Sequence, residues 1–205
     1  ISACLVGSEM CIRDRYMDLG RVSWADDRGI RQSRLYAISA GIGFDALVCE
    51  LALHAKLKTF LNRIGLGKLV YLILTVKSMR ALQVQDAYIE FEGGESYELK
   101  DMVFAAAMNQ PYEGGGVPMA PDAKNDDGLL SVIFVEDIPK KKMPRMLLRL
   151  LLKKHKKIQG LRLKDTKSVR IHSDTPLVVH SDGEFCGYRT DIRFEAEKGK
   201  LRILC

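Results

Sequence analysis

The sequence predicts an α+β domain, built as a mainly antiparallel β-sandwich with two or three appended helices. Short segments in which apolar and polar residues alternate, typical of half-buried strands, occur near both ends of the chain. Apolar residues recur at helical spacing in only a few segments between them. Strands and helices do not alternate regularly along the chain, which argues against a doubly wound parallel sheet.

Nine segments carry the predicted strands. The segment 97–109 ends in an almost wholly apolar stretch, which indicates a central strand that is buried on both faces. The first two strands flank the polar turn 25–32 and predict a hairpin-like start. The strand segments are 16–24, 33–41, 86–94, 97–109, 129–137, 168–173, 176–183, 190–197 and 200–205.

Three segments have helical periodicity. One helix is expected to begin near Asp45, where the apolar residues take up a helical period, and a second fits residues 66–82. The third segment, residues 139–157, is basic and amphipathic. Most of its Lys and Arg residues are predicted to lie opposite an apolar face formed by Met143, Met146, Leu147, Leu150 and Leu151.

The bulk composition fits a folded globular protein. The 205 residues suffice for one sizeable domain, or one and a half, and they are 47% hydrophobic and 28% charged. The longest apolar candidate, from Arg63 to Gln83, is interrupted by cations, which excludes an integral membrane protein. The five cysteines are odd in number and have no CxxC spacing, so neither a zinc ribbon nor a disulfide framework is indicated. A reducing cytoplasm is the simplest compartment.

The N-terminal stretch, residues 1–15, is expected to be foreign to the fold. It lacks the basic start and long apolar stretch of a signal peptide. The string LVGSEMCIRDR, from Leu5 to Arg15, looks like the translation of a sequencing-library adapter. We therefore expect the native sequence to begin near Tyr16, within a longer gene product, and residues 16–205 to form the domain.

The positive charge is concentrated in one segment. Residues 140–170, the basic segment, contain thirteen Lys or Arg and one acid, which leaves 19 basic and 25 acidic residues elsewhere. An anionic partner is therefore expected there. Nucleic acid is disfavoured, because aromatic residues make up only 7% of the chain and the basic helix has none to stack on bases.

Two readings of the basic helix remain open. It either docks on an anionic membrane or packs against the core with a solvated basic face. The membrane contacts would come from Lys153, Lys154, Lys156 and Lys157.

Three further stretches combine acids with glycines. The loop 114–128 offers the Asp127 carboxylate and main-chain carbonyls as hard oxygen donors, but it does not match a calcium-binding EF-hand loop. Asp182 and Glu184 lie two residues apart across a glycine, a pairing suited to a metal or to proton transfer. Asp45 follows the SAGIGF stretch, whose glycines do not fit GxGxxG.

Each of these stretches also has a purely structural interpretation. The first two are ordinary turns in that interpretation, and Asp45 is a helix N-cap. His155, beside four lysines, reads as a surface residue. His54, His172 and His180 have no partners at metal-binding spacing and are assigned no role.

Taken in order, these stretches resemble the bacterial diacylglycerol kinase and lipid kinase family, specifically its C-terminal domain. The resemblance extends over nearly all of residues 16–205, and the ordered set is more specific than any single motif. The motifs that carry it are ISAGIGFDA (38–46), LGKLVYL (66–72), MNQPYEGGG (108–116), MAPDAKNDDGLLSV (119–132), KKHKK (153–157) and SDGEF (181–185).

The resemblance implies roles for individual residues. It implies a structural Mg²⁺ held by the Asp127 side chain and by the main-chain carbonyls of Lys124 and Leu129. It implies that Glu184 is the catalytic base and that Asp182 is a nearby acid of a metal and water network. In the related sphingosine kinases, the position of Asp45 contacts the lipid head group.

The chain departs from the family pattern in one respect. Full-length members begin with an α/β domain that carries a GGDGT nucleotide-binding motif, and this string does not occur here. The expectation is therefore a C-terminal part of an ATP- and Mg²⁺-dependent lipid kinase that is inactive without its nucleotide-binding domain. A homodimer and a peripheral place on the inner face of the membrane are compatible with that expectation.

The substrate expected from this resemblance is diacylglycerol or a similar lipid alcohol. The alternatives are a kinase for another lipid, such as a sphingoid base or a cell-envelope lipid, and a non-catalytic β-sandwich that binds anionic membranes.

Overall fold

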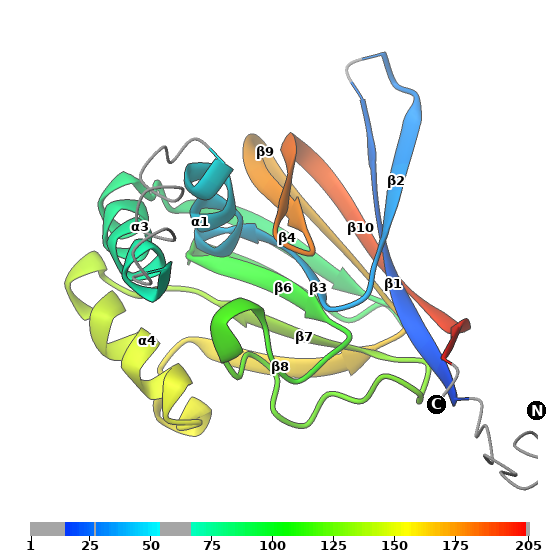
Figure 1. Cartoon of the computed structure of the whole chain (residues 1–205). Coiled ribbons are helices and arrows are strands. Elements are labelled where there is room, and N and C mark those ends of the chain that lie inside the picture. Colours follow the sequence, from blue (N-terminus) through cyan, green and yellow to red (C-terminus); the bar gives the residue numbers. More distant parts are fainter. Residues whose placement is uncertain (1–14, 27, 54–66, 204–205) are drawn as a thin grey trace, which may run out of the picture.

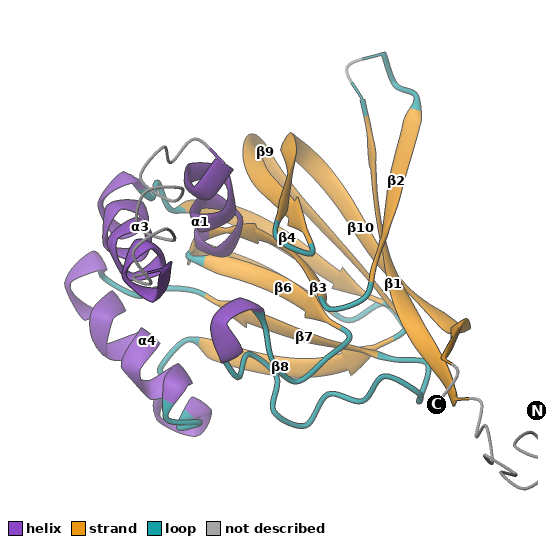
Figure 2. Cartoon of the chain, viewed as in Figure 1, coloured by secondary structure: helices purple, strands orange, loops and turns teal. Residues whose placement is uncertain are grey.

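The computed structural model of the chain describes residues 15–26, 28–53 and 67–203. Its ten strands form one sheet in which every pairing is antiparallel, and three helices gather on one side of it (Figures 1 and 2). This arrangement confirms the predicted α+β class. The strands are β1 (Arg15–Ala25), β2 (Arg31–Tyr36), β3 (Ser39–Gly43), β4 (Gln85–Phe91), β5 (Ser96–Met102), β6 (Phe104–Met108), β7 (Leu130–Val135), β8 (Leu161–Thr166), β9 (Ser168–Ser181) and β10 (Glu184–Ile203). The helices are α1 (Phe44–Leu53), α3 (Gly67–Ala81) and α4 (Met143–Leu151).

The sheet branches at its longest strands. Its main path runs β2-β1-β10-β9-β3-β6-β7-β8, and β4 pairs with β9 and with β5. Strand β9 has 14 residues and therefore holds two neighbours on one edge, β4 near His172 and β3 near His180. The branch brings the ends of β3 and β9 together, and that is where the candidate site lies.

The domain has two apolar cores, one on each face of β6. Ala105 and Ala107 of β6 face a core built mainly from β4, β7, β9 and β10. Phe104 and Met108 face the second core, which includes residues of α1 and α4. All five β6 residues are buried, which confirms the strand expected to be covered on both faces.

Several predicted strand boundaries were wrong. The segment 33–41 is two strands, because the Asp182 carboxylate accepts hydrogen bonds from the backbone between them. The segment 97–109 also divides into two: β5 stays paired with β4 up to Met102, with an irregular register near Asp101, which has a φ of 47°, and β6 then pairs with β3 and β7. Four short C-terminal strands were expected, but β9 and β10 are two long strands with bulges. Strand β8 was missed altogether.

The prediction for the basic helix was wrong at its apolar face. Met143, Met146 and Leu150 are buried in the second core, whereas Leu151 is 54% exposed and Leu148 is 56% exposed. Leu147 is partly buried against that core. The helix therefore has apolar residues on its outer side as well as on its inner side.

Two sequence expectations concern residues that the structure covers only in part. The proposed non-native stretch, residues 1–15, lies outside the described residues except for Arg15, which opens β1 and pairs with Ile203. His54 also lies outside them. Within the described residues, no helix is long and apolar enough to cross a membrane.

Candidate active site

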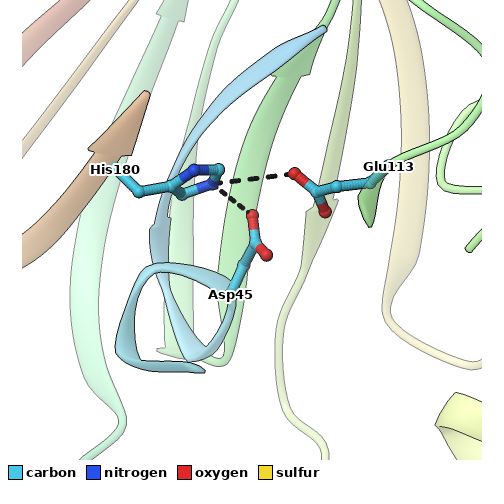
Figure 3. Close-up of side chains that lie close together, drawn as sticks. All are labelled: Asp45, Glu113 and His180. Atoms are coloured by element: carbon cyan, nitrogen blue, oxygen red, sulfur yellow. Dashed lines mark hydrogen bonds and ion pairs between the residues drawn. The ribbon is translucent and has the colours of Figure 1, made fainter. Parts of the chain in front are cut away.

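A histidine and two carboxylates meet at the junction of β3, β9 and α1. The Nε2 atom of His180 lies 2.6 Å from Oδ2 of Asp45 and 3.8 Å from Oε1 of Glu113 (Figure 3). The His180 side chain is 1% exposed, and the two acidic side chains are 14% and 16% exposed. Each of the three residues offers one ligand atom, and these atoms lie within 4.8 Å of one another, close enough to surround a single metal ion.

The local sequence places Asp45 in this cluster. Helix α1 starts at Phe44, directly after β3, so Asp45 lies in the first helical turn, where a negative charge is favoured. Its carboxylate binds His180, so the N-cap interpretation is wrong. Gly41 makes room for this pair: a Cβ atom at Gly41 would lie 2.7 Å from Asp45 Oδ2 and 2.8 Å from His180 Nε2.

Burial and mutual charge shift all three pKa values. Burial and the neighbouring Asp45 charge raise the pKa of Glu113 to about 8. Burial alone would lower the pKa of His180, but the charge and hydrogen bond of Asp45 outweigh it and raise this pKa to about 9. The pKa of Asp45 is lowered: burial opposes the shift, and the His180 charge and hydrogen bond outweigh burial. His180 and Glu113 therefore keep their protons to a higher pH in the folded cluster than they would as free side chains.

The second nitrogen of His180 points toward the next turn. Gly183 N lies 3.3 Å from Nδ1, a contact that a protonated Nδ1 would lose. In this geometry Nδ1 accepts the Gly183 N–H, and the hydrogen on Nε2 is donated to the Asp45 carboxylate. His180 thus lies between the acidic cluster and the Asp182–Gly183 turn.

Asp182 shapes the backbone around the cluster. Asp182 and Gly183 have φ values of 48° and 81° and form the two-residue loop between β9 and β10, as in a type I′ hairpin. The Asp182 carboxylate accepts hydrogen bonds from the N–H groups of Ala37, Ile38 and Ser39 at 2.8–3.1 Å. The structure therefore gives Asp182 a turn-forming role.

Glu184 lies on the rim, outside the buried cluster. Its side chain is 67% exposed and accepts a hydrogen bond from the guanidinium of Arg34 in β2. Ser39 connects the rim to the cluster, because its N–H donates to Asp182 and its hydroxyl donates to Glu113. The sequence-predicted Asp45, Asp182 and Glu184 are thus brought to one side of the β3–β9 junction.

The predicted magnesium loop is held in place by a buried acid that the sequence did not reveal. Asp18 in β1 is 1% exposed, and its carboxylate accepts hydrogen bonds from Gly128 N and Gly199 N, each at 2.6 Å. Its own N–H donates to the carbonyl of Asn125 at 2.7 Å. Asp18 therefore pins this loop from both sides.

The residues present fit a small, hard cation. Asp127 is exposed, and one of its oxygens accepts the N–H of Leu129 at 3.0 Å. Within the described residues, no turn or loop N–H donates a hydrogen bond to the carbonyl of Lys124 or of Leu129. One carboxylate and two such carbonyls form the kind of oxygen donor set that Mg²⁺ prefers.

The four lysines of the predicted membrane contact are all exposed, but the histidine among them is not. Lys153, Lys154, Lys156 and Lys157 flank His155, which is 8% exposed. His155 Nε2 lies 2.9 Å from the carbonyl oxygen of Pro118, which can only accept a hydrogen bond. The expectation of a surface histidine was wrong, because His155 anchors the basic segment to the loop that follows Glu113.

Sequence reasoning missed Glu113, His180 and Asp18. His180 was assigned no role because it has no partner at metal-binding spacing in the sequence; in the structure it contacts Asp45 and Glu113, which lie far away in the chain. The available signals were a polar residue inside the apolar strand PLVVHS and an acid at an inward position of β1.

Comparisons with known proteins agree with this fold. Residues 38–205 match the family model described as "YegS C-terminal NAD kinase beta sandwich-like domain". The chain is 28% identical over 189 residues to "Putative lipid kinase YtlR" of Bacillus subtilis, covering 92% of this chain and 60% of the relative. It is 25% identical over 170 residues to "Diacylglycerol kinase" of Mycobacterium tuberculosis, covering 82% of this chain and 50% of the relative.

A solved structure shares the architecture. A crystal structure titled as that of a "putative diacylglycerol kinase" from Bacillus anthracis superposes with a TM-score of 0.62 at 18% identity, covering 93% of this chain and 56% of that one. At this identity the similarity shows the fold alone. The chain spans roughly half the length of the curated relatives it matches. By its family match, the chain belongs to the YegS C-terminal NAD kinase beta sandwich-like domain family.

Proposed function

We propose that this domain is the C-terminal part of an ATP-dependent lipid kinase that phosphorylates diacylglycerol or a similar lipid alcohol. The names of its relatives and its family membership support a kinase. The observation that carries the proposal is the junction itself: Asp182, two residues before the exposed Glu184, is linked to Asp45 through Ser39, Glu113 and His180.

In this proposal Glu184 is the general base. Its carboxylate is held at the rim of the junction by an ion pair with the Arg34 guanidinium. The lipid hydroxyl gives its proton to Glu184 as its oxygen bonds to the γ-phosphorus, and the bond from that phosphorus to the bridging oxygen of ADP breaks. Proton removal is a modest part of such a reaction, because phosphoryl transfer depends mostly on positioning and charge neutralisation.

The other predicted site residues have supporting roles. Asp45 receives a polar group of the lipid head, and His180 and Glu113 fix the orientation of its carboxylate. Asp182 holds the turn that carries Glu184. Asp127 and the carbonyls of Lys124 and Leu129 would hold a structural Mg²⁺, which supplies positive charge and rigidity to the loop.

We further propose that the domain works with an N-terminal nucleotide-binding domain at the inner face of the membrane. The lysines at 153, 154, 156 and 157 would contact anionic lipid there. Each exposed cation near such a surface adds about 1 kcal/mol of attraction. Charge reversal at all four lysines should abolish binding to anionic vesicles if they make this contact.

The activity can be tested in a chimera in which this chain replaces the C-terminal half of the Bacillus subtilis relative. ATP-dependent phosphorylation of diacylglycerol is expected, and Glu184→Gln should lower kcat at least a hundredfold. Glu98→Gln is the matched control, because Glu98 is also an exposed acid paired with a cation, Lys100.

Two outcomes would contradict the proposal. Turnover retained in the Glu184→Gln chimera would remove Glu184 as the base. A folded chimera that binds ATP but phosphorylates neither diacylglycerol nor other lipid alcohols would refute the kinase assignment. Preference for a sphingoid base or a cell-envelope lipid in the same assay would favour the alternative substrates.

A further inference from the structure

We propose that the outer face of α4 is a docking surface for an anionic phospholipid bilayer, and that three leucines insert into the bilayer there. The three are Leu148, Leu151 and Leu152, the last being the residue that caps the helix. This inference deepens the proposed function, since a lipid kinase must reach a substrate embedded in a membrane. It goes beyond the lysine contact because it assigns binding to apolar side chains.

The three leucines form one exposed apolar ridge. Their exposed fractions are 56% for Leu148, 54% for Leu151 and 52% for Leu152. Residues three and four apart share a helix face, so Leu148 is adjacent to both of the others. The core contacts of α4 come from Met143, Met146 and Leu150, on the opposite side of the helix. The ridge is therefore not needed to hold the helix on the domain.

Exposed cations lie at both ends of α4. Lys140, Lys141 and Lys142 precede α4, and Lys153 and Lys154 follow it, all of them exposed. An apolar strip bordered by lysines matches the boundary between anionic head groups and acyl chains, where amphipathic helices lie. Figure 1 shows α4 at the periphery of the molecule, on the side of the helical layer.

The same charges disfavour a second copy of this chain as the occupant. A symmetric dimer through this face would bring each ridge and its lysines against the identical ridge and lysines. Like charges placed opposite one another oppose association. An anionic bilayer satisfies both the apolar ridge and the cations, so it is the occupant we infer.

Two contacts link this surface to the candidate site. The Lys153 ammonium donates a hydrogen bond to the Tyr112 hydroxyl at 2.7 Å, and the next residue, Glu113, belongs to the buried cluster. His155 binds the carbonyl of Pro118 on the other side of the same loop. Docking at α4 would therefore hold the Glu113 loop close to the membrane surface from which the lipid comes.

The experiment is vesicle flotation of the whole 205-residue chain. The vesicles are phosphatidylcholine alone or phosphatidylcholine with about one third phosphatidylglycerol. We expect binding to the anionic vesicles, and an at least tenfold loss of affinity when Leu148, Leu151 and Leu152 are all changed to Ser. Leu35→Ser is the control, because Leu35 is an exposed leucine (44%) that lies on β2 and not on α4. Thermal unfolding of each variant shows whether it is folded.

Salt separates the apolar contribution from the charge contribution. Raising NaCl screens the lysines but not the leucines, so residual binding of the native chain at about 0.5 M salt should vanish in the triple variant. Equal vesicle binding by the folded triple variant and the native chain would overturn the proposal. So would absence of vesicle binding together with a dimer in sedimentation that the triple variant lacks. The experiment measures vesicle binding and not phosphorylation. A negative kinase assay would therefore contradict the proposed function without contradicting the docking surface.

Discussion

The Nε2 atom of His180 lies 2.6 Å from Oδ2 of Asp45, although the two residues are 135 positions apart in the chain. His180 sits near the end of β9, and Asp45 sits in the first turn of α1. The contact exists only when β3 pairs with β9. Because the contact is present only in the folded chain, protonation of the pair changes the free energy of unfolding. A measurement of that free energy against pH therefore tests the pair.

Stability should fall as the pH rises from about 4.5 to about 9. The pKa of His180 is raised from 6.5 to about 9, so its favourable charge is fully present below 6.5 and lost as the pH passes 9. The pKa of Glu113 is raised from 4.5 to about 8, so the fold retains its proton longer than the unfolded chain does. Each retained proton gives a slope of at most about 1.4 kcal/mol per pH unit. Urea unfolding at several pH values from about 4.5 to about 10 measures this slope.

Glu113→Gln tests the origin of that slope. Glutamine keeps the shape but cannot ionise, so the decline between pH 4.5 and 8 should become shallower than in the native chain. Glu98→Gln, which changes an exposed acid, should leave the slope unchanged. An identical pH profile for native and Glu113→Gln chains would show that Glu113 does not hold its proton in the fold.

A methyl group at Gly41 should break the His180–Asp45 pair. The added Cβ would lie under 3.0 Å from both partner atoms and 3.1 Å from the Ala105 carbonyl, so one partner must move. Overpacking of this kind costs about 1–3 kcal/mol. Gly114→Ala is the matched control, because its Cβ would meet no atom within 4 Å and no positive φ constrains it. Urea unfolding measures the stability of the two variants, and only Gly41→Ala should lose stability. The pH dependence of its stability should also be weaker than that of the native chain, and equal stability of the two variants would contradict the prediction.

The sequence predicted the fold class because period-two and helical patterns are local properties. Strand limits failed where long-range partners decide them. Strand β3 is separated from β2 because Asp182, more than 140 residues away, binds the intervening N–H groups. Strands β9 and β10 continue through polar stretches because they pair with each other and with β1 and β4.

The candidate site was predictable only in part, for a similar reason. Asp45, Asp182 and Glu184 stand beside glycines in recognisable stretches, so the sequence marks them. Glu113 and His180 become part of the site only because the fold places them beside Asp45. No local sequence pattern indicates that placement. Leu151 was assigned to the core because helical spacing alone cannot fix the width of the buried face.

Asp182→Ala should destabilise the domain more than Asp182→Asn. Alanine removes all three acceptor contacts to the backbone of residues 37–39, at a cost of about 1–3 kcal/mol. Asparagine keeps one acceptor oxygen and tolerates the positive φ of 48° at this position. Thermal unfolding of the two variants measures the difference. Equal stabilities would contradict the turn-forming role, and a large activity loss in a stable Asp182→Asn chimera would indicate a catalytic one.

Asp18 and Asp127 should affect the loop 124–129 differently: Asp18 should support its stability with or without metal, and Asp127 should support only the effect of Mg²⁺. Asp18→Asn places an amide where two N–H groups donate at 2.6 Å, so it should cost about 2–3 kcal/mol with or without metal. Asp127 is exposed, and an Asn there can still accept the N–H of Leu129. Asp127→Asn should therefore leave the metal-free stability within about 0.5 kcal/mol but abolish any rise in Tm on adding Mg²⁺.

Asp126→Asn, beside it and also exposed, is the control. A Mg²⁺-dependent rise in Tm that survives in Asp127→Asn would place the ion elsewhere, and a normal metal-free Tm in Asp18→Asn would show that the buried carboxylate does not hold the loop.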